Sequence, residues 1–223
     1  MGLRGPKPKG KVKIKWSGDF AYAIGLIATD GCLSKSGRHV ALTSKDKEQL
    51  DNFLECLEIK SSIGKTLSGY NRKSYGRVQI GDVLFYKFLK TIGLTQAKSK
   101  TMGELKIPKE YFFDFLRGVL DGDGYTYSYW DPRWRSSFMF YLGFVSASRK
   151  FIDWLQKEVF DRISVKGHIT FSKTKGACYQ LKYAKSDAVK ILKKMYHSEN
   201  IRYLSRKKLK IDKMLAIVGA SLD

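Results

Sequence analysis

The sequence has few of the residues that build disulfide-stapled or zinc-bound folds. Its 223 residues include 3 cysteines and 3 histidines. Cys32, Cys56 and Cys178 are odd in number and have no CxxC spacing, which excludes a disulfide framework and a zinc site. The histidines lack the mutual spacing of a metal cluster or of an HNH-type nuclease. We therefore expect the cysteines to be reduced packing residues.

Long apolar segments are also missing. No run approaches the roughly 20 apolar residues that span a bilayer, and the start, MGLRGPKPKG, lacks the apolar core of a signal peptide. We expect a protein of the cytoplasm or an organellar matrix that is not secreted. Residues 1–16 are basic and include Pro6 and Pro8, which predicts a flexible arm that either follows a phosphate backbone or stays solvated.

Acidic residues are scarce relative to basic ones. The chain carries 42 Lys and Arg against 21 Asp and Glu, a formal charge of +21. A compact chain with this excess repels itself, and neutralising phosphates relieves the repulsion. The composition therefore indicates a polyanionic partner, while 43% hydrophobic content suffices for one large core or two modest cores that share an interface.

The chain contains an internal repeat. Residues 23–31 read AIGLIATDG and residues 116–124 read LRGVLDGDG, so that Gly25 aligns with Gly118 and Asp30 with Asp123. Duplication implies pseudo-twofold symmetry. A nucleic-acid duplex offers two strands that are related by the same operation.

The rest of each copy follows the same frame. Apolar stripes of helical period at 50–57 and 85–92 recur at 152–159 and 188–195, with Asp82 and Ser186 as expected N-caps. Alternating segments of strand type lie between them. The predicted fold is α+β with two pseudo-twofold related α-β-β-α-β-β-α halves at 17–92 and 109–223, an arm at 1–16 and a linker at 93–108.

The later copy is longer between its first two helices, where the segment YTYSYWDPRWR occurs. This length predicts a longer hairpin in the second half. Tyr125, Tyr127 and Tyr129 alternate along it, and the sequence leaves open whether they pack on the core or contact DNA sugars.

Each repeated helix ends in an acid followed by glycine. An Asp at a helix C-terminus is disfavoured by the helix dipole, so a compensating charge is needed, and a divalent cation is the simplest one. Gly25 and Gly118 permit close packing of the helices, which would bring Asp30 and Asp123 together. Mg²⁺ prefers oxygen ligands, so two carboxylates and phosphate oxygens predict a site that hydrolyses phosphodiesters.

The two nonapeptides resemble the paired motifs of the LAGLIDADG homing endonucleases in their single-chain form, and the resemblance runs from about Ser17 to the end of the chain. It implies central motif helices, saddle-shaped sheets and a staggered double-strand break with 3′ overhangs. It also implies that Asp30 and Asp123 bind Mg²⁺, with Mn²⁺ or Ca²⁺ at the same sites, beside the main-chain carbonyls of Gly31 and Gly124.

A basic residue after the second strand is common in this family, where it acts on water or phosphate charge. Lys45 occupies that place and is the expected third catalytic residue, or else an ordinary surface lysine. Its counterpart is Ala147, for which Arg149 is a weak substitute, so the two halves are asymmetric. Asp121 aligns with Ala28 and is interpreted as a helix-end or surface contact.

Strand alternation predicts a polar and basic outer face on both sheets. The resemblance implies that this face follows the major groove of double-stranded DNA, with a long pseudo-palindromic or asymmetric target bound by a monomer. The residues expected to contact DNA are His39, Thr43, Tyr75, Arg77, Gln79, Arg135, Tyr141, Lys166, His168, Thr170, Gln180 and Lys182.

Two further functions use the same scaffold. One is an RNA maturase that assists intron splicing, and the other is a DNA-binding regulator that does not cut. The presence of both Asp30 and Asp123 favours cleavage.

Overall fold

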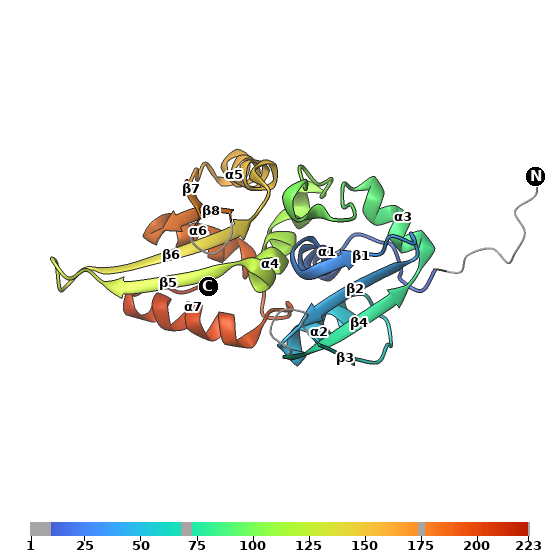
Figure 1. The fold of residues 1–223 in the computed structure, drawn as a ribbon. Coiled ribbons are helices and arrows are strands. Elements are labelled where there is room, and N and C mark those ends of the chain that lie inside the picture. Colours follow the sequence, from blue (N-terminus) through green and yellow to red (C-terminus); the bar gives the residue numbers. More distant parts are fainter. Residues whose placement is uncertain (1–9, 68–72, 174–176, 223) are drawn as a thin grey trace, which may run out of the picture.

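The computed structural model describes residues 10–67, 73–173 and 177–222, and these form two halves of similar build (Figure 1). In each half a four-stranded antiparallel sheet is combined with α-helices. The first half consists of α1 (Gly18–Asp30), β1 (Gly31–Leu33), β2 (His39–Ser44), α2 (Lys47–Cys56), β3 (Gly64–Leu67), β4 (Ser74–Gly81) and α3 (Val83–Thr91). The second consists of α4 (Phe112–Asp123), β5 (Tyr125–Trp130), β6 (Phe138–Ser146), α5 (Arg149–Ile163), β7 (His168–Ser172), β8 (Cys178–Ala184) and α6 (Lys185–Met195).

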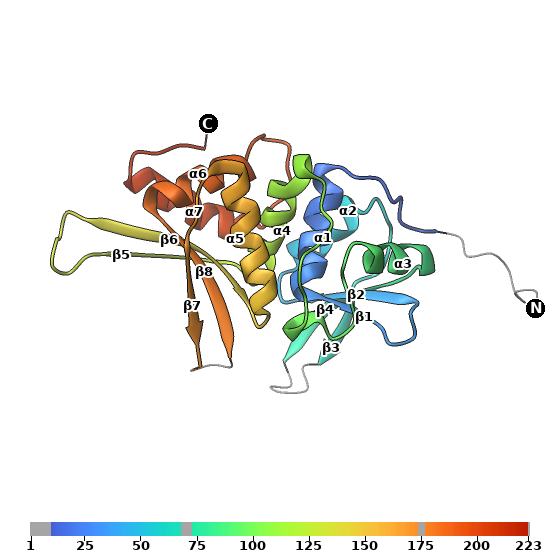
Figure 2. The same cartoon turned by 90° about the horizontal axis from the view of Figure 1, so that it is seen from above.

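This order confirms the predicted α+β class and the repeated α-β-β-α-β-β-α frame. The strand orders are β1-β2-β4-β3 and β5-β6-β8-β7, so the two sheets have the same topology. Seen from above, the sheets lie on one face of the molecule and most helices on the other, with α1 and α4 side by side between the halves (Figure 2).

The two motif helices are buried because they are apolar around most of their circumference. Ser17 caps α1, and its Oγ accepts a hydrogen bond from the Phe20 amide at 3.1 Å. Every residue from Phe20 to Ala28 is buried. In α4 the buried stretch runs from Asp114 to Asp121. Both helices therefore belong to a core that the halves share.

Alternation along the strands places the apolar side chains as predicted. In the first sheet Val40, Leu42 and Val78 are fully buried. The register pairs Thr43 with Arg77 and places both on the opposite, outer face. In the second sheet the buried inner face is formed by Phe140, Leu142, Phe144, Leu181 and Tyr183.

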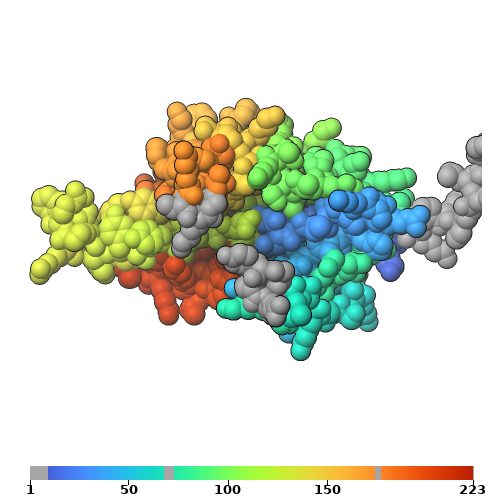
Figure 3. Space-filling model, viewed as in Figure 1, coloured from blue at the N-terminus to red at the C-terminus, as the bar shows by residue number. Residues whose placement is uncertain are grey.

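The hairpin of the second half is longer, as its sequence predicts. Strands β5 and β6 have 6 and 9 residues, whereas β1 and β2 have 3 and 6. In the space-filling view the hairpin forms a lobe that projects beyond the rest of the second half (Figure 3). Tyr127 pairs with Tyr141 on the outer face, so the alternating tyrosines do not pack into the core.

The predicted helix caps have different outcomes. Asp82 caps α3, because its Oδ1 accepts a hydrogen bond from the Phe85 amide at 2.9 Å. The expectation for Ser186 is wrong: α6 begins at Lys185, its N-cap is Ala184, and no side chain caps it. Strand β8 leads directly into α6, which leaves Ser186 inside the first turn.

The linker and the part of the expected arm that the structure describes, residues 10–16, make contacts that their composition does not indicate. Residues 1–9 of the arm lie outside the described residues. The amides of Lys11 and Val12 donate to Asp82 Oδ2 at 2.5 and 3.0 Å, and Trp16 packs edge-on against Phe20. In the linker Leu94, Lys98, Met102 and Leu105 are buried.

A further α-helix, α7 (Ser205–Ile217), follows the second repeat, and the described residues of the first half form no counterpart to it. It packs near β5 through Ile211, Met214 and Leu215, which are buried. None of the helices in the described part of the chain combines the length and apolar character that a bilayer crossing requires.

Candidate active site and outer sheet surface

The site begins with the contact between α1 and α4. A Cβ atom on Gly25 would lie 2.3 Å from the Phe115 carbonyl oxygen, and one on Gly118 would lie 2.1 Å from the Tyr22 carbonyl oxygen. No larger residue fits at either position without moving a backbone. The two glycines therefore set a direct main-chain contact between the helices.

This contact brings the two acids to one place, at the adjoining ends of α1 and α4. A Cβ atom on Gly122 would lie 3.2 Å from Asp30 Oδ2, so the last turn of α4 borders the Asp30 carboxylate. The charges of Asp30 and Asp123 also repel each other. The structure thus places the two acids on the same side of the molecule, as the repeat predicts.

The position after each acid has no room for a side chain, so it requires glycine. Gly31 and Gly124 have φ values of −79°, which any residue adopts. A Cβ on Gly31 would however lie 2.5 Å from the Ile27 carbonyl oxygen, and one on Gly124 would lie 2.5 Å from the Leu120 Cα. The sharp change from helix to strand therefore needs glycine at both places.

Asp30 is half-buried and held by a side chain from α2. Gln49 Nε2 donates to Asp30 Oδ2 at 2.9 Å, and Ser44 Oγ donates to Gln49 Oε1 at 2.6 Å. The Ser44 bond fixes which end of the amide faces the acid. Burial and then repulsion from Asp123 raise the pKa of Asp30 to about 6, while the Gln49 hydrogen bond lowers it.

Asp123 keeps an exposed surface, yet the surrounding protein displaces part of its water. This desolvation raises the pKa of Asp123, and the positive charges of Lys207 and Lys98 oppose the rise. Both acids are therefore carboxylates whose negative charge the protein compensates incompletely.

Two lysines flank the acids in matching positions. Lys98 Nζ donates to the Gly31 carbonyl oxygen, and Lys207 Nζ donates to the Gly124 carbonyl oxygen at 2.8 Å. The Lys207 ammonium also caps the end of α4, because it donates to the carbonyl oxygens of Leu120, Asp121 and Gly122 at 2.6, 2.9 and 3.0 Å. Each glycine that follows an acid thus has one lysine on its carbonyl.

Burial lowers the pKa of both lysines, and the neighbouring acids oppose that effect. Lys98 is 6% exposed, so burial lowers its pKa, and the negative charges of Asp123 and Asp30 partly offset this decrease. For Lys207 burial lowers the pKa to about 8, while Asp121, Asp30 and Asp123 raise it. The two acids and two lysines form one electrostatic cluster.

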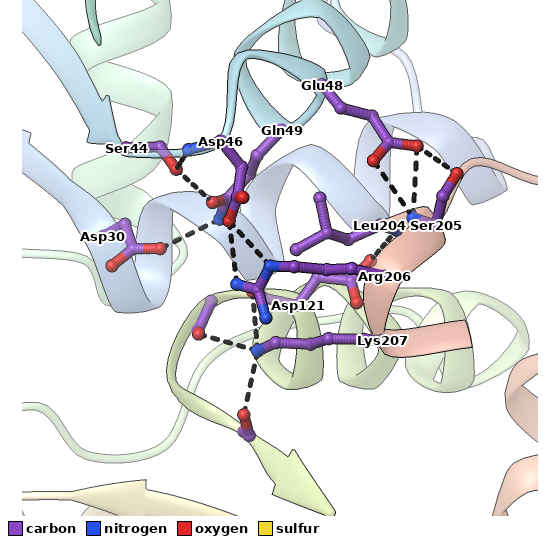
Figure 4. A network of polar contacts seen from close by, with 12 residues as sticks. Asp30, Ser44, Asp46, Glu48, Gln49, Asp121, Leu204, Ser205, Arg206 and Lys207 are labelled. Carbon is purple, nitrogen blue, oxygen red and sulfur yellow. Dashed lines mark hydrogen bonds and ion pairs between the residues drawn. The ribbon is translucent and has the colours of Figure 1, made fainter. Parts of the chain in front are cut away.

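Lys207 lies in the first turn of α7, and contacts with the first half hold this turn in place (Figure 4). The Ser205 amide donates to both carboxylate oxygens of Glu48 at 3.1 Å. The Arg206 guanidinium donates to Asp46 Oδ2 at 2.8 and 3.0 Å. Glu48 lies in α2 and Asp46 is its N-cap. We call these contacts the α2–α7 clasp; through it the first half supports a lysine of the second.

Of the two interpretations of Asp121 from the sequence, the surface contact is wrong, and the helix-end contact agrees with its place near the end of α4. It is 1% exposed, and its Oδ2 accepts from the Tyr22 hydroxyl and the Leu204 amide, each at 2.8 Å. Burial raises its pKa to about 6. Asp121 therefore joins α1, α4 and the start of α7 from the inside. A buried polar contact of this kind depends on tertiary packing, which the repeat alignment does not contain.

Lys45, the lysine expected from the sequence, lies outside this cluster. It is exposed on the sheet side, with its Nζ 5.7 Å from the centre of the Tyr75 ring. Arg149 forms an ion pair with Asp153 at 2.7 Å in α5. Sequence reasoning missed Lys98 because it lies in the expected linker, and Lys207 because it follows the repeat.

The expected contact residues of the first half gather on one outer face. Gln79 pairs with Ala41 and Arg77 with Thr43 across β2 and β4. Arg77 also donates to Gln79 Oε1 at 3.0 Å. His39 and Tyr75 share this face by alternation along the same strands.

The second sheet presents the equivalent face. His168 pairs with Lys182 and Thr170 with Gln180, and Gln180 accepts from the Tyr125 hydroxyl at 3.2 Å. Tyr141 lies on the same face, the exposed Lys166 precedes β7, and the exposed Arg135 lies in the turn between β5 and β6.

The comparisons with known proteins agree with this geometry. Residues 17–93 match the family model described as a LAGLIDADG-like domain. No curated protein sequence matches the chain. Among solved structures, I-WcaI bound to its DNA recognition sequence has a TM-score of 0.58 at 14% identity, covering 94% of this chain and 95% of that one. I-DmoI in complex with DNA and Ca has a TM-score of 0.57 at 15% identity, covering 87% and 97%.

A third similar structure is that of a protein with a different name, DUF199/WhiA. Full-length DUF199/WhiA from Thermatoga maritima has a TM-score of 0.55 at 15% identity and covers 92% of this chain, which spans 62% of the WhiA chain. These identities establish the fold. Residues 17–93 therefore match a LAGLIDADG-like domain, and the chain as a whole shares its fold with the homing endonucleases I-WcaI and I-DmoI.

Proposed function

We propose that this protein is a site-specific endonuclease that hydrolyses double-stranded DNA with divalent metal ions and leaves a staggered break with 3′ overhangs. One observation carries the proposal. The carboxylates of Asp30 and Asp123, at the ends of α1 and α4, are near enough to repel each other, and the charges of Lys98 and Lys207 act on both. A cluster of this kind suits a phosphodiester better than a small neutral substrate.

The donor set fits Mg²⁺, and Mn²⁺ or Ca²⁺ as alternatives. Asp30 and Asp123 would hold the ion, and their raised pKa values reflect negative charge that a cation would neutralise. Among the described residues no group of three or more His, Cys, Asp or Glu side chains could hold a metal. The remaining ligands would thus be water and phosphate oxygens, which matches the incomplete protein shell that Mg²⁺ usually has.

The backbone carbonyls of Gly31 and Gly124 would border the same ion. Each already accepts a lysine ammonium, and a carbonyl oxygen has a second lone pair. When bound, Mg²⁺ supplies Lewis acidity and lowers the pKa of a coordinated water. I-DmoI has been solved with DNA in complex with Ca, in complex with Mn and in the presence of Mg, which supports divalent ions for this fold.

The chain's own residues would orient the substrate and stabilise its charge. Lys98 and Lys207 are fixed on carbonyl oxygens, so their ammonium groups are preorganised beside the acids and would stabilise negative charge that develops on phosphate. Gln49 would keep the Asp30 carboxylate in one orientation. We assign the basic role to Lys98 and Lys207, and to Lys45 a phosphate contact at the edge of the site.

The outer faces of the two sheets would bind the DNA. They carry the polar and basic side chains described above, and a net charge of +21 favours a long duplex partner. The I-WcaI and I-DmoI structures are complexes with DNA, which supports the same partner for this chain. Arg77 would address guanine and Gln79 and Gln180 adenine, so that side chains from both halves read one long target.

The test is to select cleaved sites from a randomised duplex library with Mg²⁺ and with EDTA, and then to cut the selected duplex with variants. Asp123→Asn should lower the cleavage rate by at least about a thousandfold with unchanged DNA affinity, because a metal ligand is lost. The control Asp161→Asn, at an exposed position of α5, should cut normally. Cutting by Asp123→Asn at the normal rate refutes the assigned metal role.

The same experiment separates the alternative functions. A DNA-binding regulator that does not cut would retain duplex affinity and select no cleaved sites. An RNA maturase would bind intron RNA and keep that activity in Asp123→Asn. Duplex affinity should also fall steeply with salt, because many phosphates are neutralised.

A further inference from the structure

One face of α4 buries three charged residues where the corresponding face of α1 is apolar. We call Asp114, Arg117 and Asp121 the α4 stripe, because their spacing places them on one side of the helix. All three are buried, and Arg117 has no exposed surface. The repeat aligns the stripe with small or aliphatic residues of α1 that are buried as well, namely Ala21, Ile24 and Ala28.

The ion pair within the stripe is a poor choice if stability is its only role. Arg117 Nη1 donates to Asp114 Oδ1 at 2.7 Å, and both side chains are buried. Taking two charges out of water offsets most of their attraction, and an apolar pair of similar size is often at least as stable. Helix α1 has such residues at the aligned positions. The role of the pair is therefore to be sought in its other contacts.

Arg117 joins the two ends of the segment between α6 and α7, residues 196–204, which we call the connecting segment. Its Nη1 donates to the carbonyl oxygen of Met195, the last residue of α6, at 2.6 Å. Its Nε donates to the Arg202 carbonyl oxygen at 2.8 Å. A guanidinium donates in fixed directions, so it sets the separation of these two carbonyls. The guanidinium also lies 5.4 Å from the centre of the Tyr22 ring in α1.

The two acids of the stripe hold the same segment. Asp114 Oδ1 is hydrogen-bonded to His197 Nε2 at 3.1 Å. Asp121 Oδ2 accepts from the Leu204 amide at 2.8 Å, and Lys207 follows within one helical turn (Figure 4). The place of the connecting segment therefore determines where α7 begins and where the Lys207 ammonium meets the carbonyl oxygens at the end of α4.

The first half brings its lysine to the site in another way. Lys98 also follows the last helix of its half, α3, and the chain between them is anchored by Leu94, which is fully buried. Gln96 Nε2 donates to the Tyr86 hydroxyl at 2.6 Å in the same stretch. The route from α6 to Lys207 is longer than the route from α3 to Lys98, and the α4 stripe supports it.

We infer that Arg117 is a positioning residue for cleavage: with Asp114 it holds the connecting segment, and through this segment it fixes Lys207 beside Asp123. This inference rests on the proposed function, in which Lys207 stabilises charge on the phosphate. Arg117 is enclosed by protein and lies away from the outer sheet surface, so its effect reaches the substrate only through the lysine.

The test exchanges the ion pair for the residue types that α1 has at the aligned positions. Asp114→Ala with Arg117→Ile removes both charges together, so neither stays buried without its partner. The single-turnover cleavage rate of the selected duplex should fall by about a hundredfold, as in Lys207→Met, while the Kd measured in EDTA stays unchanged. The matched control, Lys157→Ile with Asp161→Ala, removes an exposed ion pair of α5 and should cut at the normal rate.

A double-mutant cycle separates positioning from a general effect on the fold. When Lys207→Met is added to the exchanged protein, the rate should fall no further, because the lysine has already lost its place. Independent effects would multiply instead, to a loss of about ten-thousandfold. Leu155→Ala opens a cavity in the core beneath α5 and should lower thermal stability without changing the rate of the folded protein.

Arg117→Lys provides a second variant, which carries the test if circular dichroism shows that the exchanged protein does not fold. It keeps a charge beside Asp114 but lacks the fork that joins the two carbonyls, so the rate should fall by about tenfold, and only while Lys207 is present. Normal cleavage by the variants that fold, losses that multiply with Lys207→Met, or a changed Kd overturns the inference and leaves the proposed function standing. Failure of the wild-type protein to cut any duplex refutes both.

Discussion

The two halves of the molecule surround equivalent acids with different neighbours. In the first half Asp30 has Gln49 from α2 and is close to Lys98 from the segment that joins the halves. In the second half the third residue of α5 is Phe151, where α2 has Gln49, and Phe151 is buried in the core. Lys207 comes from α7, which lies beyond the repeat. The duplicated frame fixes the acids and glycines, while elements outside the frame supply the lysines.

Within this comparison of the halves, the largest effect is expected for the two lysines. The test is whether each lysine promotes cleavage of one strand more than of the other. Lys98→Met and Lys207→Met should each lower the cleavage rate by about a hundredfold, because a preorganised positive charge is lost beside the reacting phosphate. Each variant should slow one strand more than the other and accumulate a nicked duplex, read on denaturing gels with each strand labelled. The exposed Lys100 and Lys213, changed to Met, are the matched controls.

Equal slowing of both strands by either lysine variant would mean that the two acids and two lysines act as one centre. The comparison between the halves would then concern their structure and not their chemistry.

A smaller effect is expected at Gln49, which has no polar counterpart in α5. The Gln49 hydrogen bond lowers the pKa of Asp30, which is about 6. In Gln49→Leu that bond is lost, so the pKa of Asp30 rises further and more of the carboxylate is protonated near neutral pH. Activity requires the ionised acid, so it should fall as pH decreases through about 6 in the wild type and at a higher pH in the variant.

The measurement is the rate of cleavage against pH at a fixed Mg²⁺ concentration below saturation, where the profile of Gln49→Leu should be displaced to higher pH than that of the wild type. Ser44→Ala removes the hydrogen bond that orients Gln49, together with the one that the Ser44 hydroxyl accepts from the Asp46 amide, and should cause a weaker shift in the same direction. Coincident pH profiles for the wild type and Gln49→Leu would contradict the role of the amide.

The smallest effect concerns the α2–α7 clasp, which crosses between the halves. The Arg206–Asp46 pair is partly exposed, so Arg206→Ala should reduce the free energy of unfolding by only ~0.5 kcal/mol. The cleavage rate should fall by a larger factor than this small loss of stability explains. The reason is that the first turn of α7, which carries Lys207, is loosened. Arg202→Ala breaks the exposed pair with Glu55 and serves as the control for thermal melting and strand-specific rates.

The features of the structure that could be predicted are those that occur in both copies of the sequence repeat. The glycines and acids of the two nonapeptides give the α1–α4 contact and the meeting of Asp30 with Asp123, and strand alternation gives the outer faces. Lys98 was not predicted, because a lysine in a segment without periodicity reads as solvated linker. It is buried only because the segment folds back on the first half, where Leu94 and Leu105 are also buried.

The second lysine escaped prediction for a different reason. Lys207 lies in the sequence SRKKLK, where charge alone distinguishes none of the neighbouring basic residues. Its position is set by Leu204, whose amide bonds to Asp121, and by the clasp at Ser205 and Arg206. Contacts between residues this far apart in the chain depend on the assembled fold.

The main-chain contact at Gly25 and Gly118 sets the spacing of the reaction centres independently of what the sheets recognise. Backbone atoms in direct contact compress very little, so repacking of side chains elsewhere cannot change the separation between the ends of the two helices. In the proposed endonuclease, base preference could therefore be altered along the strands, residue by residue, while the number of nucleotides between the two cuts would stay constant.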